Sequence, residues 1–465
     1  MSSTIMKRFF PSRFLCVYQK DELVALVHQL HPEPIYLLKR AWCSINKSLA
    51  NGILLDWMYD IMPELMVRKI LIDDSTTDQQ ELKTARERAL QALDRPTILY
   101  LMMAQSCNFT CSYCPIPALA KQYGERLLSL EDAIAGIELW QKHIEEYPQN
   151  GNPYFLIFYG GEPLLNRGIL EQLLPHIARE QSAGRLPENL KLMLCTNGSL
   201  IDEGLSRIFA SYRVTVALGG DGPHIIIQRV VKQLLKNSVS AVASVIITPE
   251  NIHRLSEYPG FLQRMGITKF GFNLMKGKAL GHALSSGISI EDYCHMAAQG
   301  ILAGLSEVIQ KGQCYEYQLE KKLTALQNGL PFSVDCTCYG NQLVIQPDGQ
   351  VTNCPFLRLD QGHVRELANT FRIGRTDTVK KWRRRLPIFN DLIMADSSNE
   401  VLDGGGCAWS SSELYGDTTI RDTANTIFTK EVIHELIWTL LPEKQANLLR
   451  RKETSYWNYR RIRPL

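Results

Sequence analysis

Between about residues 97 and 275 the sequence alternates short apolar runs with longer segments of helical periodicity. The apolar runs predict strands at 97–103, 154–159, 190–195, 214–218, 241–247 and 269–274. The segments between them predict helices at 130–146, 167–181, 203–211, 225–236 and 253–265, the first of them capped by Ser129. Short strands separated by helices form parallel sheets with right-handed crossovers. The pattern therefore predicts an α/β fold, a partial (β/α)6 TIM-like barrel open on one side, with its chemistry at the C-terminal ends of the strands.

Three cysteines, Cys107, Cys111 and Cys114, lie just past the first predicted strand. Three thiolates on one short loop can bind three of the four irons of a cubane iron–sulfur cluster, which leaves the fourth iron open to a substrate or cofactor. A structural zinc site is the alternative reading, but zinc requires a fourth ligand and the next cysteine along the chain is Cys195. The spacing therefore favours chemistry at an open metal position.

Small polar residues close three of the following strands. The second strand ends in Gly160-Gly161-Glu162-Pro163, the third in Thr196-Asn197-Gly198, and the fourth in the glycine-rich run 219–223. Glycines allow a ligand to approach the backbone closely, and a carboxylate there suits a cationic amino group. We expect these strand ends to meet at the active face of the barrel.

Together these motifs resemble the radical S-adenosylmethionine (radical SAM) superfamily over about residues 97–275. The resemblance implies that the three cysteines hold a [4Fe–4S] cluster whose free iron binds the methionine amine and carboxylate of S-adenosylmethionine. An electron from the cluster then cleaves the sulfonium, and the resulting 5′-deoxyadenosyl radical abstracts a substrate hydrogen.

The resemblance also implies a set of cofactor contacts. It places Gly160, Gly161 and Glu162 at the amine, with Pro163 completing the motif, Tyr113 near adenine, and Thr196 and Asn197 near the ribose; Arg229, Ser244 and Asn273 are further candidates. Arg229 reads equally as a surface arginine, and Ser244 and Asn273 as core or turn residues. The chain departs from many peptide-modifying relatives at Gly219, where they carry serine, and it lacks their usual His-Asp before the carboxylate-binding arginine. No catalytic acid or base is identified by the pattern.

A second group of cysteines follows in the C-terminal third of the chain. Cys338, the hairpin expected at 342–353 and Cys354 resemble the start of a SPASM or twitch domain, and Cys407 beside glycines fits the distant closing ligand. With Cys336 the count reaches four, which predicts one auxiliary [4Fe–4S] cluster. Reduced structural thiols and a zinc knuckle are the alternatives. A complete SPASM domain has a further dense cysteine run that this chain lacks, so a second auxiliary cluster is not expected.

These features divide the chain into five predicted segments: an N-terminal region at 1–95, the radical SAM core at 96–287, a helical linker at 288–332, the auxiliary-cluster domain at 333–410, and a C-terminal helix and basic tail at 411–465. In the first segment, 22–30 and 54–71 show helical spacing and 83–93 is a strong helix former. This segment is either a helical cap on the barrel or a domain that resembles the leader-peptide-binding winged helices of peptide maturases. The last segment predicts a helix at 429–451 with a break at Pro442.

The overall composition narrows the possible setting of the protein. The 465 residues are 45% hydrophobic and 21% charged, which is typical of folded globular proteins. A net charge of +3 gives no reason to expect a nucleic-acid partner, and no apolar run is long enough to cross a bilayer. The 12 cysteines cluster at metal-ligand spacing, which favours a reducing cytoplasm over a disulfide framework.

The function expected from this resemblance is that of a radical SAM oxidoreductase acting on a ribosomally synthesised precursor peptide (RiPP maturation). Crosslinking, excision and epimerisation are all compatible with it. The resemblance also implies an external electron donor of the flavodoxin or ferredoxin type, and a separate leader-peptide-recognition protein is a further possible partner. A sulfatase-maturase-like enzyme, an enzyme acting on a small metabolite, and a non-catalytic iron–sulfur scaffold or electron carrier remain the alternatives.

Overall fold

A nine-stranded sheet lies at the centre of the protein, in the order β12-β11-β10-β9-β8-β7-β6-β13-β14. The computed structural model describes residues 8–52, 56, 58–146, 153–219, 224–284, 287–310, 315–329, 334–390 and 402–446. The strands of this sheet are β6 (Ile98–Ala104), β7 (Phe155–Gly160), β8 (Lys191–Thr196), β9 (Thr215–Gly219), β10 (Ala241–Ile247), β11 (Lys269–Leu274), β12 (Tyr315–Glu316), β13 (Gln342–Ile345) and β14 (Val351–Thr352). Neighbours from β12 to β13 are parallel, and β14 pairs antiparallel with β13.

The six strands expected from the sequence are confirmed to within one residue at each end. The helices that follow them are α4 (Ile116–Tyr123), α5 (Leu130–Glu145), α6 (Arg167–Ser182), α7 (Glu203–Ser211), α8 (His224–Lys236) and α9 (Tyr258–Arg264), with the 3-10 turns η1 (Pro163–Asn166) and η2 (Ile252–Glu257). Ser129 caps α5 as expected, because its side chain accepts a hydrogen bond from the Asp132 amide at 3.0 Å. The helix expected at 253–265 is divided into η2 and α9, and Pro259 stands in the first turn of α9, where its missing N–H costs nothing.

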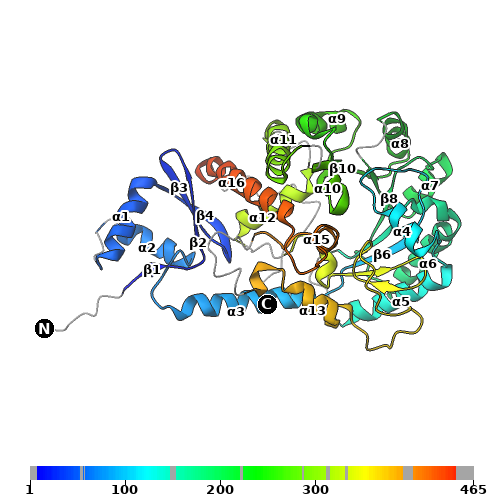
Figure 1. Ribbon diagram of the computed structural model, residues 1–465, viewed down its shortest axis with the longest axis horizontal. Helices are drawn as coiled ribbons and strands as arrows, with labels where there is room; N and C mark the ends of the chain where they lie inside the picture. The colour runs from blue at the N-terminus through cyan, green and yellow to red at the C-terminus, as the bar shows by residue number, and fades with distance from the viewer. Residues whose placement is uncertain are drawn as a thin grey trace.

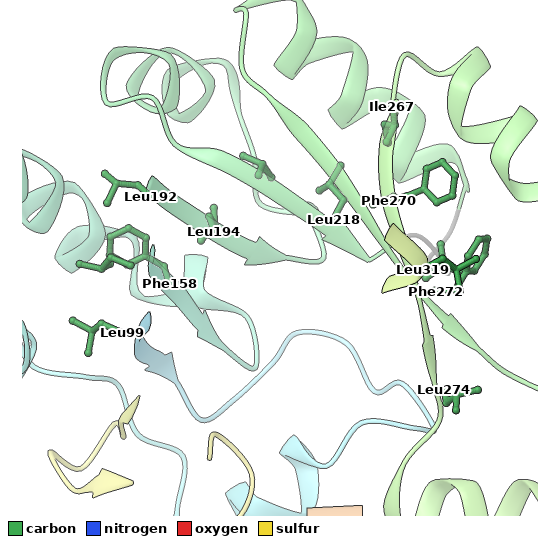
Figure 2. Close-up of a cluster of buried hydrophobic side chains, with 14 of the residues drawn as sticks. Leu99, Phe158, Leu192, Leu194, Leu218, Ile267, Phe270, Phe272, Leu274 and Leu319 are labelled. Atoms are coloured by element: carbon green, nitrogen blue, oxygen red, sulfur yellow. The ribbon is translucent and has the colours of Figure 1, made fainter. Parts of the chain in front are cut away.

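Alternation along the strands separates the two faces of this sheet. Figure 2 shows buried side chains on neighbouring strands, among them Leu99 on β6, Phe158 on β7 and Leu194 on β8. These residues belong to the main hydrophobic core with the covering helices. Because side chains alternate, the residues between them, such as Tyr159 and Cys195, lie on the concave face of the barrel. The concave face is where a substrate would enter.

The N-terminal region is a separate unit at one end of the molecule, drawn in blue in Figure 1. It contains β1 (Phe10–Pro11), β2 (Leu15–Lys20), β3 (Leu23–His28), β4 (His31–Leu38), α1 (Lys39–Ala50), α2 (Met58–Val67), β5 (Leu71–Ile72) and α3 (Thr76–Leu93). Strands β2, β3 and β4 form an antiparallel sheet in that order, and β1 pairs with β5. Helix α3 leads out of this unit toward β6 and lies beside the 3-10 turn η5 (Pro387–Phe389) (Figure 1).

The helical reading of residues 22–30 is wrong, because Leu23–His28 is the central strand β3. A run of six apolar or half-polar residues with two valines fits a fully buried strand as well as a buried helix, and periodicity alone does not separate them. Val24 to His28 are at most 1% exposed, because both faces of β3 are packed: Ala25 and Val27 lie in the main core, and Val24 and Leu26 lie in a second apolar cluster of the N-terminal region. Residues 54–71 contain α2, and β5 begins at Leu71; residues 53–55 and 57 lie outside the described residues.

The segment expected as a linker, 288–332, contains α11 (Ile290–Gln310) and α12 (Tyr317–Asn328), and the short strand β12 precedes α12. Helix α10 (Gly277–Leu284) lies before it, within the segment expected as the core. Residues 311–314 and 330–333 lie outside the described residues. Helix α12 packs on β4 of the N-terminal sheet, and α11 packs on α16 (Thr423–Ala446) (Figure 1). The linker helices therefore contact both the N-terminal sheet and the C-terminal helix α16.

Helix α16 continues to Ala446, so the break expected at Pro442 is wrong. The helix is anchored before the proline by Val432, Ile433 and Ile437, which are buried in the main core. Proline removes one backbone hydrogen bond near the end of this helix, which packing of the preceding turns outweighs. Residues 447–465, including the basic tail, lie outside the described residues. Within the described chain, no helix is both long and apolar enough to span a bilayer.

The remaining C-terminal elements surround the second cysteine group. They are η3 (Thr337–Tyr339), the β13–β14 hairpin, η4 (Ile373–Arg375), α13 (Asp377–Arg383), η5 and α15 (Ala408–Tyr415). The hairpin was expected from the sequence, but its parallel pairing with β6 was not. This pairing places the segment that carries Cys336, Cys338 and Cys354 at the β6 edge of the barrel.

Candidate functional site

The three cysteines Cys107, Cys111 and Cys114 lie on the loop between β6 and α4, at the C-terminal end of β6. The loop is turned back on itself, since the Cys114 amide donates to the Cys111 carbonyl at 3.1 Å. Burial raises the pKa of the Cys107 thiol and raises that of Cys114 to about 11, and the neighbouring thiols of the set add to both shifts. The three sulfurs therefore share one electrostatic environment, and a metal that bound them would displace their protons.

The donors around Cys107 fit a thiolate that is bound to metal. Its sulfur accepts from the Phe109 amide at 3.4 Å and from the Asn197 side-chain amide at 3.8 Å. Hydrogen bonds to the charged form favour it, so these contacts stabilise negative charge on the sulfur. In the described part of the chain, no three His, Cys, Asp or Glu side chains close around a single point as they would around one metal ion. A cubane requires a wider arrangement, because each thiolate binds a different iron.

Gly160 and Gly161 fix the cysteine loop against the end of β7. A Cβ on Gly160 would lie 2.4 Å from the Ala104 carbonyl oxygen, and a Cβ on Gly161 would lie 2.1 Å from that of Ser106. The amides of Gly161 and Glu162 donate to the same two carbonyls, at 2.8 and 3.0 Å. The two glycines were expected because a ligand must approach the backbone closely here. In the structure it is the cysteine loop that approaches the backbone at these positions.

Glu162 is fully buried, and its carboxylate is used inside the protein. It accepts hydrogen bonds from the Leu164 amide at 3.0 Å, the Thr196 hydroxyl at 2.7 Å and the Asn197 amide at 2.9 Å. Burial raises the pKa of Glu162, and these three bonds oppose that rise. Glu162 therefore joins the end of β7 to the end of β8, and its expected contact with a ligand amine stays a prediction.

The expected ribose-binding residues lie next to this carboxylate. Besides its bond to Glu162, Thr196 accepts from the Gly198 amide at 3.0 Å, so both partners of its hydroxyl are internal. Asn197 reaches the cysteine loop, where its side-chain amide donates to Asn108 at 2.8 Å. Arg229 on α8 is exposed and donates to the Ser199 carbonyl at 3.3 Å. The structure thus brings Glu162, Thr196 and Asn197 together with the cysteine loop and places Arg229 at its rim.

The remaining expected contacts have the following positions. Pro163 begins η1, for which Glu162 is the N-cap, and half-buried Tyr113 packs against the main core. Ser244 on β10 accepts from the Asn273 side chain on β11 at 3.0 Å. Of the glycine-rich end of the fourth strand, Gly219 closes β9, and residues 220–223 lie outside the described residues.

Tyr317 is a concave-face residue that the sequence did not reveal. Its phenol is hydrogen-bonded to Asn273 and Ser244, and burial raises its pKa to about 12. Its ring covers Gly271, where a Cβ would lie 2.0 Å from ring carbon Cζ. Strand β12, which positions Tyr317, has only two residues, so periodicity gives no signal for it. The glycine in the middle of a buried strand was the available clue.

The four C-terminal cysteines are brought together from separate elements. Cys336 and Cys338 flank the start of η3, Cys354 follows β14, and Cys407 is the N-cap of α15. The hydrogen bond from Cys338 lowers the pKa of Cys336 to about 6, and the charges of Lys276 and Arg385 add to this effect. Burial raises the pKa of Cys354, and the neighbouring thiols of Cys407 and Cys336 raise it further. Burial also raises the pKa of Cys407, and the thiol of Cys336 adds to that rise. The four thiols therefore form one cluster in a buried pocket.

A buried guanidinium beside the four cysteines indicates whether this site suits an anionic group. Arg385, just beyond α13, is 1% exposed, and its Nε and Nη1 atoms have no hydrogen-bond partner. An uncompensated charge in the protein interior is costly, so a negative group beside it would relieve a large penalty. Four thiolates around an iron–sulfur core supply such a charge, and the residues present fit it.

An aromatic column connects the two cysteine groups. The ring centroids of Tyr159 and Phe356 are 6.0 Å apart, and those of Phe356 and Trp409 are 5.3 Å apart. Phe356 packs in the apolar cluster that contains Cys107 and Cys114 and also in the cluster that contains Cys338 and Cys354. Phe356 therefore packs against both of the apolar clusters to which cysteines of the two groups belong.

The fold and the cysteine loop together define a class of protein. Residues 101–246 match the family model described as the Radical SAM superfamily. These residues run from β6 through the cysteine loop to β10. This segment of the chain therefore matches the superfamily that the sequence motifs resemble.

Particular relatives are more distant. The chain is 23% identical over 440 residues to the radical SAM cyclopropyl synthase TigE of Paramaledivibacter caminithermalis, a match that covers 84% of each protein. Among solved structures it is similar to anSMEcpe with bound AdoMet, with a TM-score of 0.60 and 17% identity over 74% of this chain and 95% of that one. The same enzyme with bound AdoMet and the Cp18Cys peptide gives a TM-score of 0.55 and 18% identity over 74% of this chain and 98% of that one. At these identities the solved structures support the fold.

Proposed function

We propose that this protein is a radical SAM enzyme that modifies a ribosomally synthesised peptide. The observation that carries the proposal is the position of the cysteine loop. Hydrogen bonds from Gly161 and Glu162 fix that loop at the mouth of an open barrel. A four-cysteine pocket stands at the adjoining sheet edge, where β13 pairs with β6. One group would start the radical reaction, and the other would lie along the wall of the substrate space.

In this proposal Cys107, Cys111 and Cys114 hold a [4Fe–4S] cluster, and S-adenosylmethionine binds at its open iron. When bound, this pair supplies a 5′-deoxyadenosyl radical that removes a hydrogen atom from the substrate. Within the chain, Asn197 and the Phe109 amide orient the Cys107 sulfur through their hydrogen bonds. Glu162 holds the ends of β7 and β8 at a fixed separation. Cys336, Cys338, Cys354 and Cys407 would hold one auxiliary [4Fe–4S] cluster in a SPASM- or twitch-like domain.

A peptide substrate is supported by the open side of the sheet and by one relative. The structure of anSMEcpe described above contains a peptide together with AdoMet. In this chain the concave face is lined by Tyr159, Cys195 and Tyr317, and the phenol of Tyr317 and the thiol of Cys195 are kept neutral by burial, which raises each pKa to about 12. Neutral, half-buried side chains suit an uncharged peptide segment better than a charged metabolite.

The N-terminal unit offers a separate place for a leader segment. Strand β2 pairs with β3 alone among the described strands, so its other edge is available for the addition of a peptide strand. We expect hydrogen–deuterium exchange of residues 15–20 to slow when a precursor peptide is added. Unchanged exchange in this strand together with tight binding would place the peptide elsewhere or on a separate recognition protein.

Cyclopropane formation is a second, more specific candidate. It is favoured by the similarity to a cyclopropyl synthase along 84% of the chain. Such a product requires a new carbon–carbon bond and the loss of two hydrogens from the substrate: one hydrogen atom would pass to the 5′-deoxyadenosyl radical, and the second would leave as a proton while its electron passes to the auxiliary cluster. Mass spectrometry would therefore show a loss of about 2 Da from the peptide, whereas epimerisation leaves the mass unchanged.

The experiment first searches the neighbouring genes for a short precursor peptide. That peptide is then incubated under anaerobic conditions with reconstituted enzyme, S-adenosylmethionine and a reduced flavodoxin or ferredoxin. Modified peptide is expected from the parent protein and from Cys43→Ala, a control at an exposed cysteine outside both groups. Cys338→Ala should still cleave S-adenosylmethionine but give no product. Cofactor cleavage without any change in the peptide would favour a small-metabolite or sulfatase-type substrate, and no cleavage at all would favour an electron carrier.

A further inference from the structure

Arg385 is a buried cation that forms no ion pair among the described residues. It is 1% exposed and lies among the largest fully buried side chains. One terminal nitrogen, Nη2, donates to the Gly405 carbonyl at 3.1 Å, to the Cys407 carbonyl at 3.4 Å and to the Ser411 hydroxyl at 2.9 Å. The other two nitrogens, Nε and Nη1, have no hydrogen-bond partner among the described residues. The three groups that Arg385 bonds to in the described part of the chain are all neutral.

Other buried or half-buried cations of the same region have carboxylate partners. Lys322 pairs with Asp335 at 3.1 Å, and Lys276 lies 3.6 Å from Asp422. Arg421 pairs with Asp403. Among the ion pairs of the described residues, none involves Arg385, so this buried cation differs from its neighbours in having no paired carboxylate.

This buried cation lies beside the four-cysteine pocket. Arg385 donates to the Cys407 carbonyl at 3.4 Å, and the next residue, Leu386, packs in the same apolar cluster as Cys338 and Cys354. Lys276 is held near the same site, because its partner Asp422 accepts a hydrogen bond from the Cys407 amide at 3.1 Å. A [4Fe–4S] core held by four thiolates has a net charge of about −2 when oxidised and about −3 when reduced. The pocket therefore has a cation where a bound cluster would place its negative charge.

We propose that Arg385 is the fixed counter-charge of the auxiliary cluster and raises its reduction potential. The inference rests on the proposed auxiliary cluster, and it adds the residue that tunes it. A buried cation stabilises the more negative, reduced state more than the oxidised one, because Coulomb interactions are weakly screened in the interior. Since Arg385 contacts neither the concave face nor the first cysteine loop among its described bonds, it acts through the cluster and is a positioning residue.

The test removes the first cluster so that one cluster remains. In a Cys107→Ala/Cys111→Ala/Cys114→Ala background, iron, sulfide and zinc are counted, and the midpoint potential is measured by a redox titration followed by electron paramagnetic resonance. Arg385→Met should lower the midpoint potential, and Arg385→Lys should restore most of it. Arg384→Met is the matched control, because Arg384 is the exposed neighbour on the same turn, and it should leave the potential unchanged.

A second variant keeps the test decisive if Arg385→Met does not fold. Ser411→Asp places a carboxylate where the hydroxyl now accepts from Arg385, so the guanidinium gains an internal partner. The cluster-free form of Ser411→Asp should melt at a higher temperature than its parent, while the loaded form should have a lower midpoint potential.

Potentials equal to the parent in both Arg385→Met and Ser411→Asp would overturn the proposal for Arg385. An unchanged potential in Ser411→Asp alone overturns it as well if the methionine variant is lost. Absence of iron, or zinc in its place, in the triple-alanine parent would instead overturn the auxiliary cluster itself. The two failures are therefore distinguishable.

Discussion

Replacing Gly161 with alanine should detach the cysteine loop from the end of β7. A Cβ at this position would lie 2.1 Å from the Ser106 carbonyl oxygen, 2.6 Å from its carbon and 3.0 Å from a methyl group of Ile116. Two of these atoms belong to the backbone, so no side-chain rotation relieves the clash. The loop itself must move away from the barrel.

The magnitude follows from the contacts that this movement disturbs. Overpacking a well-packed site costs about 1–3 kcal/mol. The amides of Gly161 and Glu162 donate to Ala104 and Ser106 at 2.8 and 3.0 Å, and loss of one such bond adds about 0.5–1.5 kcal/mol. The free energy of unfolding should therefore fall by about 1.5–4.5 kcal/mol, summed from these two effects.

The assay combines urea unfolding with the iron content of anaerobically reconstituted protein. The control is Gly168→Ala in α6, where nothing lies within 4 Å of the added Cβ. Alanine in a helix is more favourable than glycine by about 0.5–1 kcal/mol, so the control should be slightly stabilised and fully loaded. If Gly161→Ala is as stable and as rich in iron as Gly168→Ala, the role assigned to this glycine is refuted.

Three further predictions follow from other parts of the site. Gly271→Ala should destabilise the fold by about 1–3 kcal/mol, because the added Cβ clashes with the Tyr317 ring. The double variant Gly271→Ala/Tyr317→Ala should be no less stable in urea unfolding than Tyr317→Ala alone, and additive losses would contradict this contact. Burial raises the pKa of Glu316 to about 7 in the folded state, so its contribution to stability is fully present below the unfolded pKa of 4.5 and is lost as the pH rises through 7. Urea unfolding between pH 4.5 and 8 should show a smaller decline in Glu316→Gln than in the parent, and parallel curves would exclude this carboxyl as the cause. Glu162→Gln should lose about 1–3 kcal/mol in the same assay, because an amide cannot accept all three of the hydrogen bonds that the carboxylate accepts, whereas an unchanged unfolding curve would show that these bonds contribute nothing.

The barrel strands could be predicted because each is buried on its outer face and mostly buried on the inner one. Leu156 and Phe158 on β7, for example, leave an uninterrupted apolar run in the sequence. The same kind of run at Leu23–His28 does not distinguish a strand from a helix, because burial of both faces removes the alternation that identifies a strand. The sequence also gave no sign that Gln342–Ile345 pairs with β6, because that pairing joins segments more than 200 residues apart.

The site residues could be predicted where a short motif identifies them, as in both cysteine groups and the Gly160–Pro163 element. They were harder to predict where tertiary contacts determine the burial and the partners of a side chain. Arg385 ends the basic run 380–385, which resembles a solvated helix face, yet it is 1% exposed and bonds to Gly405, Cys407 and Ser411 at the start of α15. Tyr317 follows a strand of two residues and is recognisable only from its contact with Gly271. In each case the function depends on which segments meet, which local sequence does not record.

The account depends on an open iron site held by Cys107, Cys111 and Cys114, and its most direct test is the formation of 5′-deoxyadenosine. Anaerobically reconstituted protein should convert S-adenosylmethionine to 5′-deoxyadenosine and methionine when a low-potential reductant is present. Cys111→Ala should form none, while Cys338→Ala should retain this activity. Equal formation by Cys111→Ala, or none by an iron-loaded parent protein, would contradict the account.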